Sequence, residues 1–343
     1  MVEVTIAIAL YNLEDYIEES LCSALDQDFE DFEILVCDDC SSDHSLDIVR
    51  SVCESHPNGI KVRIISPDKN SKTAVIRNMA IEQAKGKYIF FLDGDDILPH
   101  NAISLLYRKM KDTKVNLVVG NMQFFNDGES LSDDNRRTFN CDSVINEKYA
   151  MAKWYSINKT NFFYVGLPNK LFDISFLRGN YLKCIPAHGV VDDIYFAFQC
   201  HLKVTSIATV SNVTYCYRNR DGSAIHSNVS LSRMNLYLHI FDLIYDDLKN
   251  EELKSDEMKI PAQLYHIITC RYLYGFITKN IMYSSLLSRK DKSKYLFKVS
   301  RIRKLNITSK DIIGRKNRLI YYLLQFKSRF WLISLLFRLM KKK

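Results

Sequence analysis

Two clusters of carboxylates stand out in this sequence, and one of them has the residue types and spacing to hold a divalent cation. Asp38 and Asp39 follow one apolar run, and the Asp-Gly-Asp-Asp sequence at residues 93–96 follows another. Carboxylates this close to one another repel unless a cation or hydrogen-bond donors compensate. Asp93 and Asp95 form a suitable ligand set for Mg²⁺ or Mn²⁺, hard cations that take carboxylate oxygens and keep positions open for diphosphate oxygens.

The sequence also excludes phosphate recognition by a glycine loop. It contains neither Gly-x-x-x-x-Gly-Lys-Ser/Thr nor Gly-x-Gly-x-x-Gly, so neither common glycine cradle for phosphates is present. A site built from carboxylates without such a cradle would bind phosphates through the cation. A nucleotidyltransferase would usually carry a glycine-rich, basic loop after its first strand, and residues 10–14 (Leu-Tyr-Asn-Leu-Glu) do not supply one.

Alternating strands and helices must position these clusters. Apolar, β-branched runs predict strands at 2–10, 32–37, 60–65, 87–92 and 115–120. Helical spacing predicts helices at 12–25, 72–85 and 101–111, and another that ends near residue 55, with Gly86 as the C′ glycine after 72–85. This alternation predicts a mostly parallel sheet covered on both faces, with ligands bound outside the carboxyl ends of its strands. An Asp after a strand is also a common helix N-cap, so that interpretation stays open for each cluster taken alone.

The net charge of +7 belongs to the end of the chain. The nine charged residues after Asp311 are all Lys or Arg, so residues 1–311 sum to −2, from 38 basic and 40 acidic residues. This argues against a nucleic-acid-binding surface over the body of the protein. The amino terminus lacks the features of a signal peptide, and no stretch of 18 or more uncharged apolar residues is present. We therefore expect a cytoplasmic protein without an ordinary membrane span.

Nine cysteines are scattered along the chain, and only Cys37 and Cys40 have the close spacing of a metal or redox pair. A structural zinc site needs a second pair, which is missing, and the two carboxylates between these thiols would raise their pKa. We expect small, buried or half-buried free thiols.

Four segments in order along residues 3–110 resemble the glycosyltransferases of family 2, which have the GT-A fold. The segments are Thr-Ile-Ala-Ile-Ala-Leu-Tyr-Asn at 5–12, the strand and acidic turn at 33–43, Ala-Val-Ile-Arg-Asn at 74–78, and residues 84–96, which lead into Asp-x-Asp. One departure is Cys40, where the family usually has Gly, and a positive φ there would carry strain. The resemblance implies an α/β GT-A fold, with a mostly parallel central sheet flanked by helices and a C-terminal helical extension.

The resemblance also implies roles for residues at the strand ends. Asp39 would bind the uracil, with Tyr11 packing near the base, and Arg77 would reach the nucleotide. Asp95 would be the principal metal ligand, and Asp93 would contact the ribose or the metal. The residues implied to contact the nucleotide-sugar are Ala9, Tyr11, Asp38, Asp39, Arg77, Asn78, Asp93, Gly94, Lys170 and Arg220.

Three later segments, at 166–172, 189–196 and 215–225, resemble the family more loosely. By this resemblance Asp193 is the general base for the acceptor hydroxyl, and Asp192 beside it would raise its pKa by like-charge repulsion. The alternative is that this pair caps the helix that starts at Ile194. His226 would be a third metal or diphosphate contact, whereas a lone His is more often structural. Asp96 either belongs to the site or caps the following helix.

The patterns divide the chain into the nucleotide-sugar-binding half of a GT-A domain (1–125), its acceptor-binding half (126–230) and a helical region (231–343). The last ends in a basic amphipathic tail (312–343), which has the composition of an interfacial membrane helix. Each basic residue near an anionic leaflet contributes about 1 kcal/mol, which would place the protein at the inner face of the cell membrane. The alternatives are that the tail packs on the body, forms a homodimer interface or binds nucleic acid.

Together, the residues and the resemblance imply an inverting glycosyltransferase dependent on Mn²⁺ or Mg²⁺. It would move a sugar from a nucleotide-sugar, which we expect to be a UDP-sugar, to a saccharide or lipid-linked saccharide in surface polysaccharide biosynthesis. The alternatives are a non-catalytic nucleotide-sugar-binding or scaffold protein and a nucleotidyltransferase. The intact set of Asp39, Asp93, Asp95 and Asp193 counts against the non-catalytic alternative.

Overall fold

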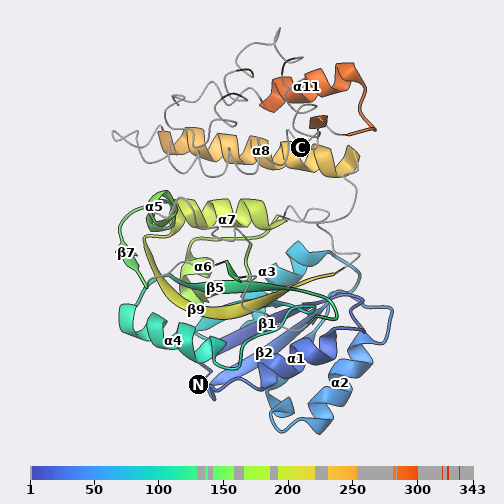
Figure 1. Cartoon of the computed structure of the whole chain (residues 1–343), viewed down its shortest axis with the longest axis vertical. Helices are drawn as coiled ribbons and strands as arrows, with labels where there is room; N and C mark the ends of the chain where they lie inside the picture. Colours follow the sequence, from blue (N-terminus) through green and yellow to red (C-terminus); the bar gives the residue numbers. More distant parts are fainter. Residues whose placement is uncertain are drawn as a thin grey trace. The chain divides into compact units, whose positions relative to one another are not determined.

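The computed structural model describes residues 2–129, 136–137, 142–157, 166–185, 192–220, 231–252, 281–282 and 284–299, with positions 319, 323 and 332. The chain forms two compact units, residues 1–226 and 227–343. The first contains the sheet, and the described part of the second contains the helices α8 and α11 (Figure 1).

One mixed sheet forms the centre of the first unit, with the strand order β3-β2-β1-β4-β8-β5-β9-β7 and with β6 paired to β5. The strands are β1 (Val4–Leu10), β2 (Phe32–Asp38), β3 (Val62–Ile65), β4 (Tyr88–Asp93), β5 (Leu117–Asn126), β6 (Arg136–Arg137), β7 (Val144–Asn146), β8 (Lys170–Asp173) and β9 (Ser206–Asn219). Strands β3, β2, β1 and β4 run parallel, β8 is antiparallel to β4 and β5, and β9 is parallel to β5. The predicted halves 1–125 and 126–230 share this sheet, because β8 lies between β4 and β5.

Helices cover both faces of the sheet, as the alternation of elements predicts. They are α1 (Ile17–Leu25), α2 (Ser45–Ser55), α3 (Thr73–Gln83), α4 (Ala102–Thr113), α5 (Ala150–Ile157), α6 (Ile174–Gly179) and α7 (Asp192–Lys203). Apolar residues of α1, α2 and α4 join those of β1, β2 and β4 in one core cluster. Helix α3 contacts β1, β2, α6 and α7, and Figure 1 shows α3, α6 and α7 above the sheet and α1, α2 and α4 below it.

The central strands β1 and β2 are buried along almost their whole length. Helices on both faces explain why their sequences are nearly continuous apolar runs rather than alternating ones. The register places Ala9 of β1 beside Cys37 of β2 on one side and beside Asp93 of β4 on the other. The carboxyl ends of these three strands therefore lie side by side. This brings the two acidic clusters to one edge of the sheet, as the sequence predicts.

The role expected for Gly86 is wrong. Helix α3 ends at Gln83 with Ala84 as its C-cap, and Gly86 is not among the residues with positive φ. Instead, Gly86 packs against β1 so closely that a Cβ atom there would lie 2.5 Å from the backbone nitrogen of Thr5. Its own N–H donates a 2.9 Å hydrogen bond to Thr5 Oγ1. Glycine is required here for space and not for a left-handed helix end.

The described part of the second unit includes α8 (Leu231–Glu252) and α11 (Arg289–Val299). The hydroxyl of Tyr295 donates a hydrogen bond of 2.9 Å to Asn235 Oδ1 and so joins the two helices. Only three positions of the predicted tail 312–343 are described. Within the part of the chain that the structure describes, no helix is both long enough and apolar enough to cross a membrane.

Candidate functional site

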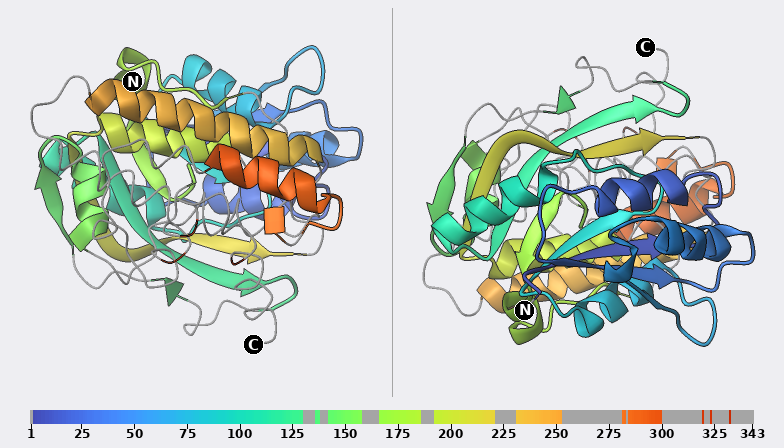
Figure 2. Two further views of the ribbon diagram at one scale, coloured as in Figure 1. Left: turned by 90° about the horizontal axis from the view of Figure 1, so that it is seen from above. Right: turned by 90° about the horizontal axis from the view of Figure 1, so that it is seen from below.

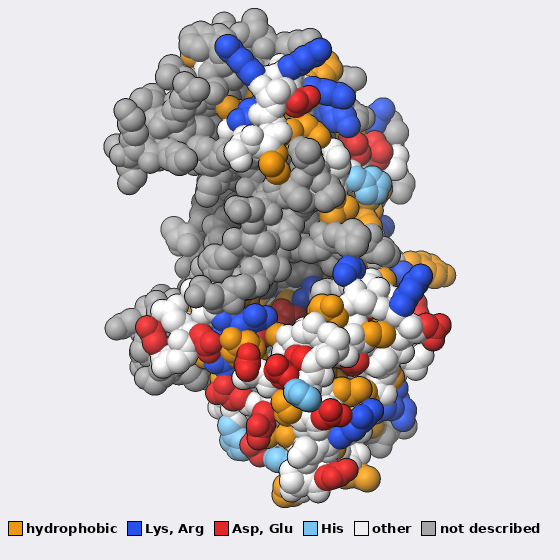
Figure 3. All heavy atoms as spheres, turned by 90° about the vertical axis from the view of Figure 1, so that its right-hand side faces the viewer, with side chains coloured by type: hydrophobic (Ala, Val, Ile, Leu, Met, Phe, Trp, Pro, Cys, Tyr) orange, Lys and Arg blue, Asp and Glu red, His pale blue; other side chains and the backbone are white. Residues whose placement is uncertain are grey.

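The carboxyl ends of β4 and β9 are joined beside the Asp-x-Asp turn. Ile97 and Cys216 form an antiparallel bridge, with backbone hydrogen bonds of 3.1 and 2.9 Å in the two directions. Figure 2 shows β5 and β9 side by side and pointing the same way. Figure 3 looks onto the side toward which they point, where acidic side chains gather on the first unit with Lys and Arg among them.

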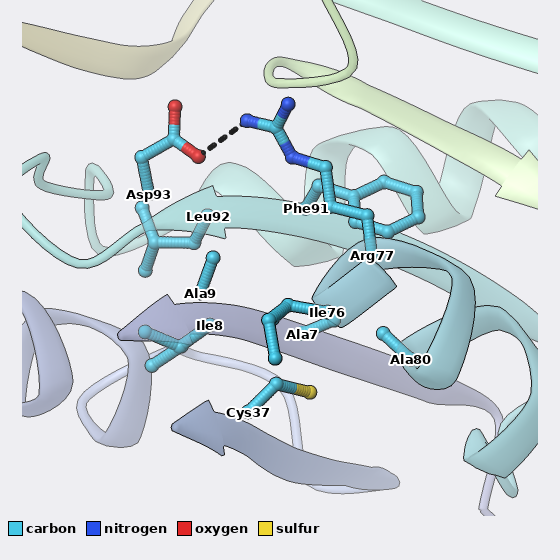
Figure 4. Close-up of a pocket in the computed structure, with 10 residues that line it drawn as sticks. All are labelled: Ala7, Ile8, Ala9, Cys37, Ile76, Arg77, Ala80, Phe91, Leu92 and Asp93. Atoms are coloured by element: carbon cyan, nitrogen blue, oxygen red, sulfur yellow. Dashed lines mark hydrogen bonds and ion pairs between the residues drawn. The ribbon is translucent and has the colours of Figure 1, made fainter. Parts of the chain in front are cut away.

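A small pocket lies at this edge, between β1, β2, β4 and α3 (Figure 4). Its floor is apolar, with Ala7, Ala9 and Cys37 among the lining residues. Burial raises the pKa of the Cys37 thiol to about 12, so this cysteine stays protonated and packs as a small apolar group. In Figure 4, Arg77 and Asp93 lie on one side of the pocket and face each other across a hydrogen bond of 2.8 Å.

Asp39 connects the end of β2 to the loop before α3. Its two carboxylate oxygens accept hydrogen bonds from the backbone N–H groups of Ser71 at 2.6 Å and Lys72 at 2.8 Å. Lys72 has φ 74° and ψ 159°, a conformation that costs a non-glycine residue strain. The Asp39 carboxylate is therefore a buried, fixed group at the sheet edge and not an N-cap of α2, which begins at Ser45.

Asp38 shapes the turn that follows β2. It accepts hydrogen bonds from the hydroxyl of Ser41 at 2.5 Å and from the backbone N–H of the same residue. Within this turn Cys40 has φ 60°. The strain expected for a cysteine in place of the family's glycine is therefore present, at a cost of about 1–2 kcal/mol.

Asp95 is paired with Arg220, the residue that follows β9 by one position. The distance from Arg220 Nε to Asp95 Oδ2 is 2.7 Å. Burial raises the pKa of the Asp95 carboxyl, the charge of Asp93 raises it further, and Arg220 opposes both effects. Both partners are about one-fifth exposed, so the pair is partly screened from water and can still be reached by a ligand.

Asp96 is the most deeply buried carboxylate of the turn. It accepts a hydrogen bond of 2.6 Å from the hydroxyl of Tyr215 and one of 2.8 Å from the backbone N–H of Arg218. Helix α4 begins only at Ala102, with Asn101 in the N-cap position, so the alternative that Asp96 caps this helix is wrong. Burial raises the pKa of Asp96 well above its ordinary value. Asp96 ties the Asp-x-Asp turn to β9.

Arg218 lies in the segment 215–225 that resembles the family, where the resemblance assigns it no role, and it proves to be the main polar anchor of this region. Its guanidinium donates to the backbone carbonyl of Asp95 at 2.8 Å and to Asp127 at 3.0 Å, and it also pairs with Glu19. The guanidinium carbon lies 4.7 Å from the centre of the Phe125 ring. Residues 215–218 read Tyr-Cys-Tyr-Arg, but this local pattern does not indicate the partners of Arg218, which lie up to 199 positions away.

Asn78 and Lys170, which are expected to contact the nucleotide-sugar, form hydrogen bonds with other segments of the protein. The amide of Asn78 donates to the carbonyl of Cys184 and accepts from its backbone N–H, both at 2.8 Å. Lys170 is buried, and its ammonium donates to the carbonyls of Gly166 at 2.7 Å and Pro168 at 3.2 Å. These contacts hold neighbouring segments together, and a contact of either side chain with a donor stays a prediction.

The remaining expected residues on β1 and β4 lie at the same edge. Tyr11 is 46% exposed directly after β1, so its ring is accessible to a base. Gly94 donates its N–H to the carbonyl of Ala9, and a Cβ atom on Gly94 would lie 2.9 Å from that carbonyl oxygen. The two strand ends can approach this closely because residue 94 has no side chain.

The predicted general base lies partly outside the described residues. Helix α7 begins at Asp192, so Asp192 and Asp193 belong to its first turn, but their side chains are not described. His226 also lies outside the described residues. The described residues do not decide whether Asp192 and Asp193 act in catalysis or cap α7.

The carboxylate oxygens of Asp93 and Asp95 are the kind of ligand that a hard divalent cation prefers. Asp93 and Asp95 supply carboxylate oxygens on one turn, and their mutual repulsion contributes to the raised pKa of Asp95. Among the described residues, no group of three or more Asp, Glu, His or Cys side chains is arranged to hold a metal. Among the described residues, Arg77 and Arg220 form ion pairs with these two carboxylates.

The sequence and the fold identify the family. Residues 5–182, more than half of the chain, match the family described as Glycosyl transferase family 2. The chain belongs to this family. Its relatives are named as glycosyltransferases, which confirms the class of enzyme expected from the sequence.

Three curated relatives of this family 2 member illustrate the range. The chain is 31% identical over 249 residues to the poly(ribitol-phosphate) beta-glucosyltransferase of Bacillus spizizenii, covering 71% of this chain and 36% of that protein. It is 25% identical over 248 residues to glycosyltransferase GlyG of Streptococcus pneumoniae (69% and 78% covered). It is 24% identical over 312 residues to the cholesterol galactosyltransferase of Borreliella burgdorferi (89% and 84% covered). The chain thus spans about a third of the length of the Bacillus relative.

Solved structures confirm the GT-A fold of this family member. Residues 1–349 of S. aureus TarS in complex with UDP-GlcNAc match with a TM-score of 0.77 at 19% identity, covering 98% of this chain and 92% of that one. The same TarS fragment without a named ligand matches with a TM-score of 0.75 at 18% identity, covering 98% and 91%.

Proposed function

We propose that this family 2 glycosyltransferase moves a sugar from a UDP-sugar to a hydroxyl of a cell-surface polymer. The observation that best supports the donor is the position of Asp39, Asp93 and Asp95 at one sheet edge, beside a pocket lined by Ala9 and Arg77. TarS has been solved with UDP-GlcNAc and with UDP. The names of TarS and of the Bacillus relative refer to poly(ribitol-phosphate), so a polyol-phosphate or saccharide acceptor is the expectation.

Donor recognition would use the groups that the fold already fixes. The Asp39 carboxylate keeps acceptor capacity beyond its two backbone hydrogen bonds and could receive the uracil N–H. The exposed ring of Tyr11 offers a face for the base. Arg77 and Arg220 would supply positive charge for the diphosphate.

Metal dependence belongs to the same proposal. Asp95 and Asp93 would hold Mn²⁺ or Mg²⁺, which when bound would neutralise negative charge on the leaving diphosphate. The contribution of the chain is to keep both carboxylates on one turn, and the contacts of Tyr215 and Arg218 to this turn fix its position.

Inversion of the anomeric centre requires one base on the acceptor side. Asp193, in the first turn of α7, would accept the proton of the acceptor hydroxyl as its oxygen attacks the anomeric carbon in line with the departing diphosphate. Asp192 beside it would favour the protonated form of the pair by like-charge repulsion.

The direct test is a panel of UDP-sugars incubated with the purified chain and Mn²⁺, with release of UDP as the measurement. Release of UDP from at least one sugar, lost when the metal is chelated, is the expected result. UDP-sugar binding without turnover under all conditions would support the scaffold alternative. Pyrophosphate release from a nucleoside triphosphate and a sugar phosphate would support a nucleotidyltransferase.

The 312–343 segment would bring the enzyme to the inner face of the cell membrane. The support is its composition, with basic residues as its only charges among aromatic and leucine residues. In a flotation assay, the full chain should float with vesicles of anionic phospholipid, and the chain ending at residue 311 should not. Equal flotation of both forms would contradict the anchor and leave packing on the body or a homodimer interface as the role of the segment.

A further inference from the structure

Each carboxylate of the Asp93–Asp95 pair contacts an arginine from a different element. Arg77 from α3 bonds to Asp93 at 2.8 Å, and Arg220 after β9 bonds to Asp95 at 2.7 Å. The four side chains are between 8% and 27% exposed. At this burial, charges interact more strongly than they do on an open surface.

The charges of these four side chains are balanced in the free protein, and they can be balanced again when a cation and a diphosphate bind together. Two guanidinium charges now neutralise two carboxylate charges, which is also what one divalent cation would do. A cation that binds alone would leave Arg77 and Arg220 without counter-charges at a half-buried edge. A diphosphate that binds alone would add negative charge beside the carboxylates. When both bind, the cation neutralises the carboxylates and the arginines neutralise the diphosphate.

We infer that Arg77 and Arg220 hold the metal-binding carboxylates in the free protein and transfer to the diphosphate when the cation arrives, so that cation and nucleotide bind cooperatively. This inference rests on the proposed function, since it takes a nucleoside diphosphate and a divalent cation as the ligands. The coupling is reciprocal by linkage, so each ligand strengthens the binding of the other by the same factor.

The contacts of Arg220 distinguish it from the neighbouring Arg218. Arg218 contacts Asp95, Asp127 and Glu19 and is fixed in place. Within the described part of the chain, the side chain of Arg220 contacts Asp95 and lies 4.9 Å from the centre of the Tyr16 ring. Release of this one ion pair would leave the Arg220 guanidinium without a hydrogen-bond partner among the described residues, and this makes Arg220 the position at which to test the exchange.

The test measures Mn²⁺ and UDP binding by calorimetry, each alone and each in the presence of the other, in the wild-type chain and in Arg220→Gln. In the wild type, UDP should tighten Mn²⁺ binding by roughly 5- to 150-fold. In Arg220→Gln, Mn²⁺ alone should bind several-fold more tightly because its competitor is gone, while UDP binds more weakly in the presence of Mn²⁺. If Mn²⁺ alone binds Arg220→Gln with unchanged or lower affinity, Arg220 does not compete with the cation, and the inference is overturned.

Two further variants separate this exchange from general damage. Arg220→Lys keeps the positive charge and should retain most of the coupling. Arg63→Gln breaks a half-buried pair with Glu33, of 3.3 Å, near the amino ends of β2 and β3, and should leave the coupling unchanged. Thermal unfolding checks that each variant is folded.

A wild type that binds no UDP with or without Mn²⁺ overturns both the proposed function and the exchange. UDP binding that is independent of Mn²⁺ overturns the exchange and the proposed metal dependence, and leaves the UDP-sugar as the proposed donor.

Discussion

The hydroxyl of Tyr215 donates a hydrogen bond of 2.6 Å to the buried carboxylate of Asp96, and the same oxygen accepts the backbone N–H of Asp93 at 3.2 Å. Burial and the charge of Asp96 raise the pKa of Tyr215 well above its ordinary value, so the phenol remains a donor. One buried hydroxyl on β9 therefore contacts both ends of the turn that carries the predicted metal ligands.

Replacement of Tyr215 by Phe should destabilise the protein and disturb this turn. The variant leaves the Asp96 carboxylate and the Asp93 N–H each without one hydrogen-bond partner, at a cost of about 1–3 kcal/mol in the free energy of unfolding. Urea denaturation measures the loss. Tyr181→Phe is the matched control, because that ring is 82% exposed and its replacement should change little. Equal stability of the two variants would show that the Tyr215 hydroxyl does not support the turn.

Replacement of Gly86 by Ala should also be destabilising, by about 1–3 kcal/mol, because the new methyl group would overlap the backbone of β1 at Thr5. Gly179 provides the control, since a Cβ atom there would meet nothing within 4 Å and Gly179→Ala should be neutral or slightly stabilising. Thermal unfolding of both variants measures the difference. A neutral effect of Gly86→Ala would mean that β1 and the segment before β4 can separate without cost.

The sequence predicts the parallel strands of the sheet well. It predicts poorly the contacts that join these strands to distant parts of the chain. Continuous apolar runs such as residues 32–37 predict buried strands. The acidic turns after them indicate the edge of the sheet at which a ligand is expected to bind. The four-residue strand β8 carries no such pattern, although it lies between β4 and β5. The position of Asp96 depends on Tyr215, 119 positions away. The Arg220–Asp95 ion pair likewise spans 125 positions, so neither local propensity nor spacing reveals it.

His201 should make the protein sensitive to acid. Burial and the neighbouring Lys170 ammonium lower the pKa of this imidazole to about 3 from its ordinary value of 6.5. Above pH 6.5 the ring is neutral in both the folded and unfolded states, so it contributes no pH dependence. Between pH 6.5 and about 3 only the unfolded state takes up the proton, and the free energy of unfolding falls by about 1.4 kcal/mol for each pH unit.

Substitution of His201 by Leu tests this contribution. Among the described residues, neither ring nitrogen of His201 has a hydrogen-bond partner, so the variant loses no such bond and should gain about 1–3 kcal/mol at neutral pH. Urea denaturation from pH 7 to pH 4 should show a flatter pH dependence in His201→Leu than in the wild type. His44→Gln alters a histidine whose side chain is 83% exposed and should leave the slope unchanged. Identical slopes for wild type and His201→Leu would show that the imidazole is not buried as a neutral group.

Asp193→Asn should abolish sugar transfer while the chain still binds UDP. The amide keeps the size of the side chain but cannot take the acceptor proton, and general-base catalysis contributes about 10²–10⁴-fold to a rate. Single-turnover kinetics and UDP calorimetry on the same preparation separate the two effects. Asp192→Asn is the neighbouring comparison and should retain most of the turnover. Wild-type turnover in Asp193→Asn would assign the Asp pair to capping of α7 instead.

Asp39→Asn should loosen the loop before α3 and weaken nucleotide binding together. An amide has one acceptor oxygen, so the backbone N–H of either Ser71 or Lys72 would lose its partner and face an N–H₂ group. The loss should be about 1–3 kcal/mol, and hydrogen exchange at both amides should accelerate. UDP affinity should fall by roughly 10-fold or more, since the same carboxylate is expected to receive the uracil N–H.

Asp47→Asn, on the exposed surface of α2, serves as the control for Asp39→Asn. If UDP affinity falls while both amides exchange at wild-type rates, Asp39 contacts the nucleotide without supporting the loop. The reverse result would assign it a structural role only.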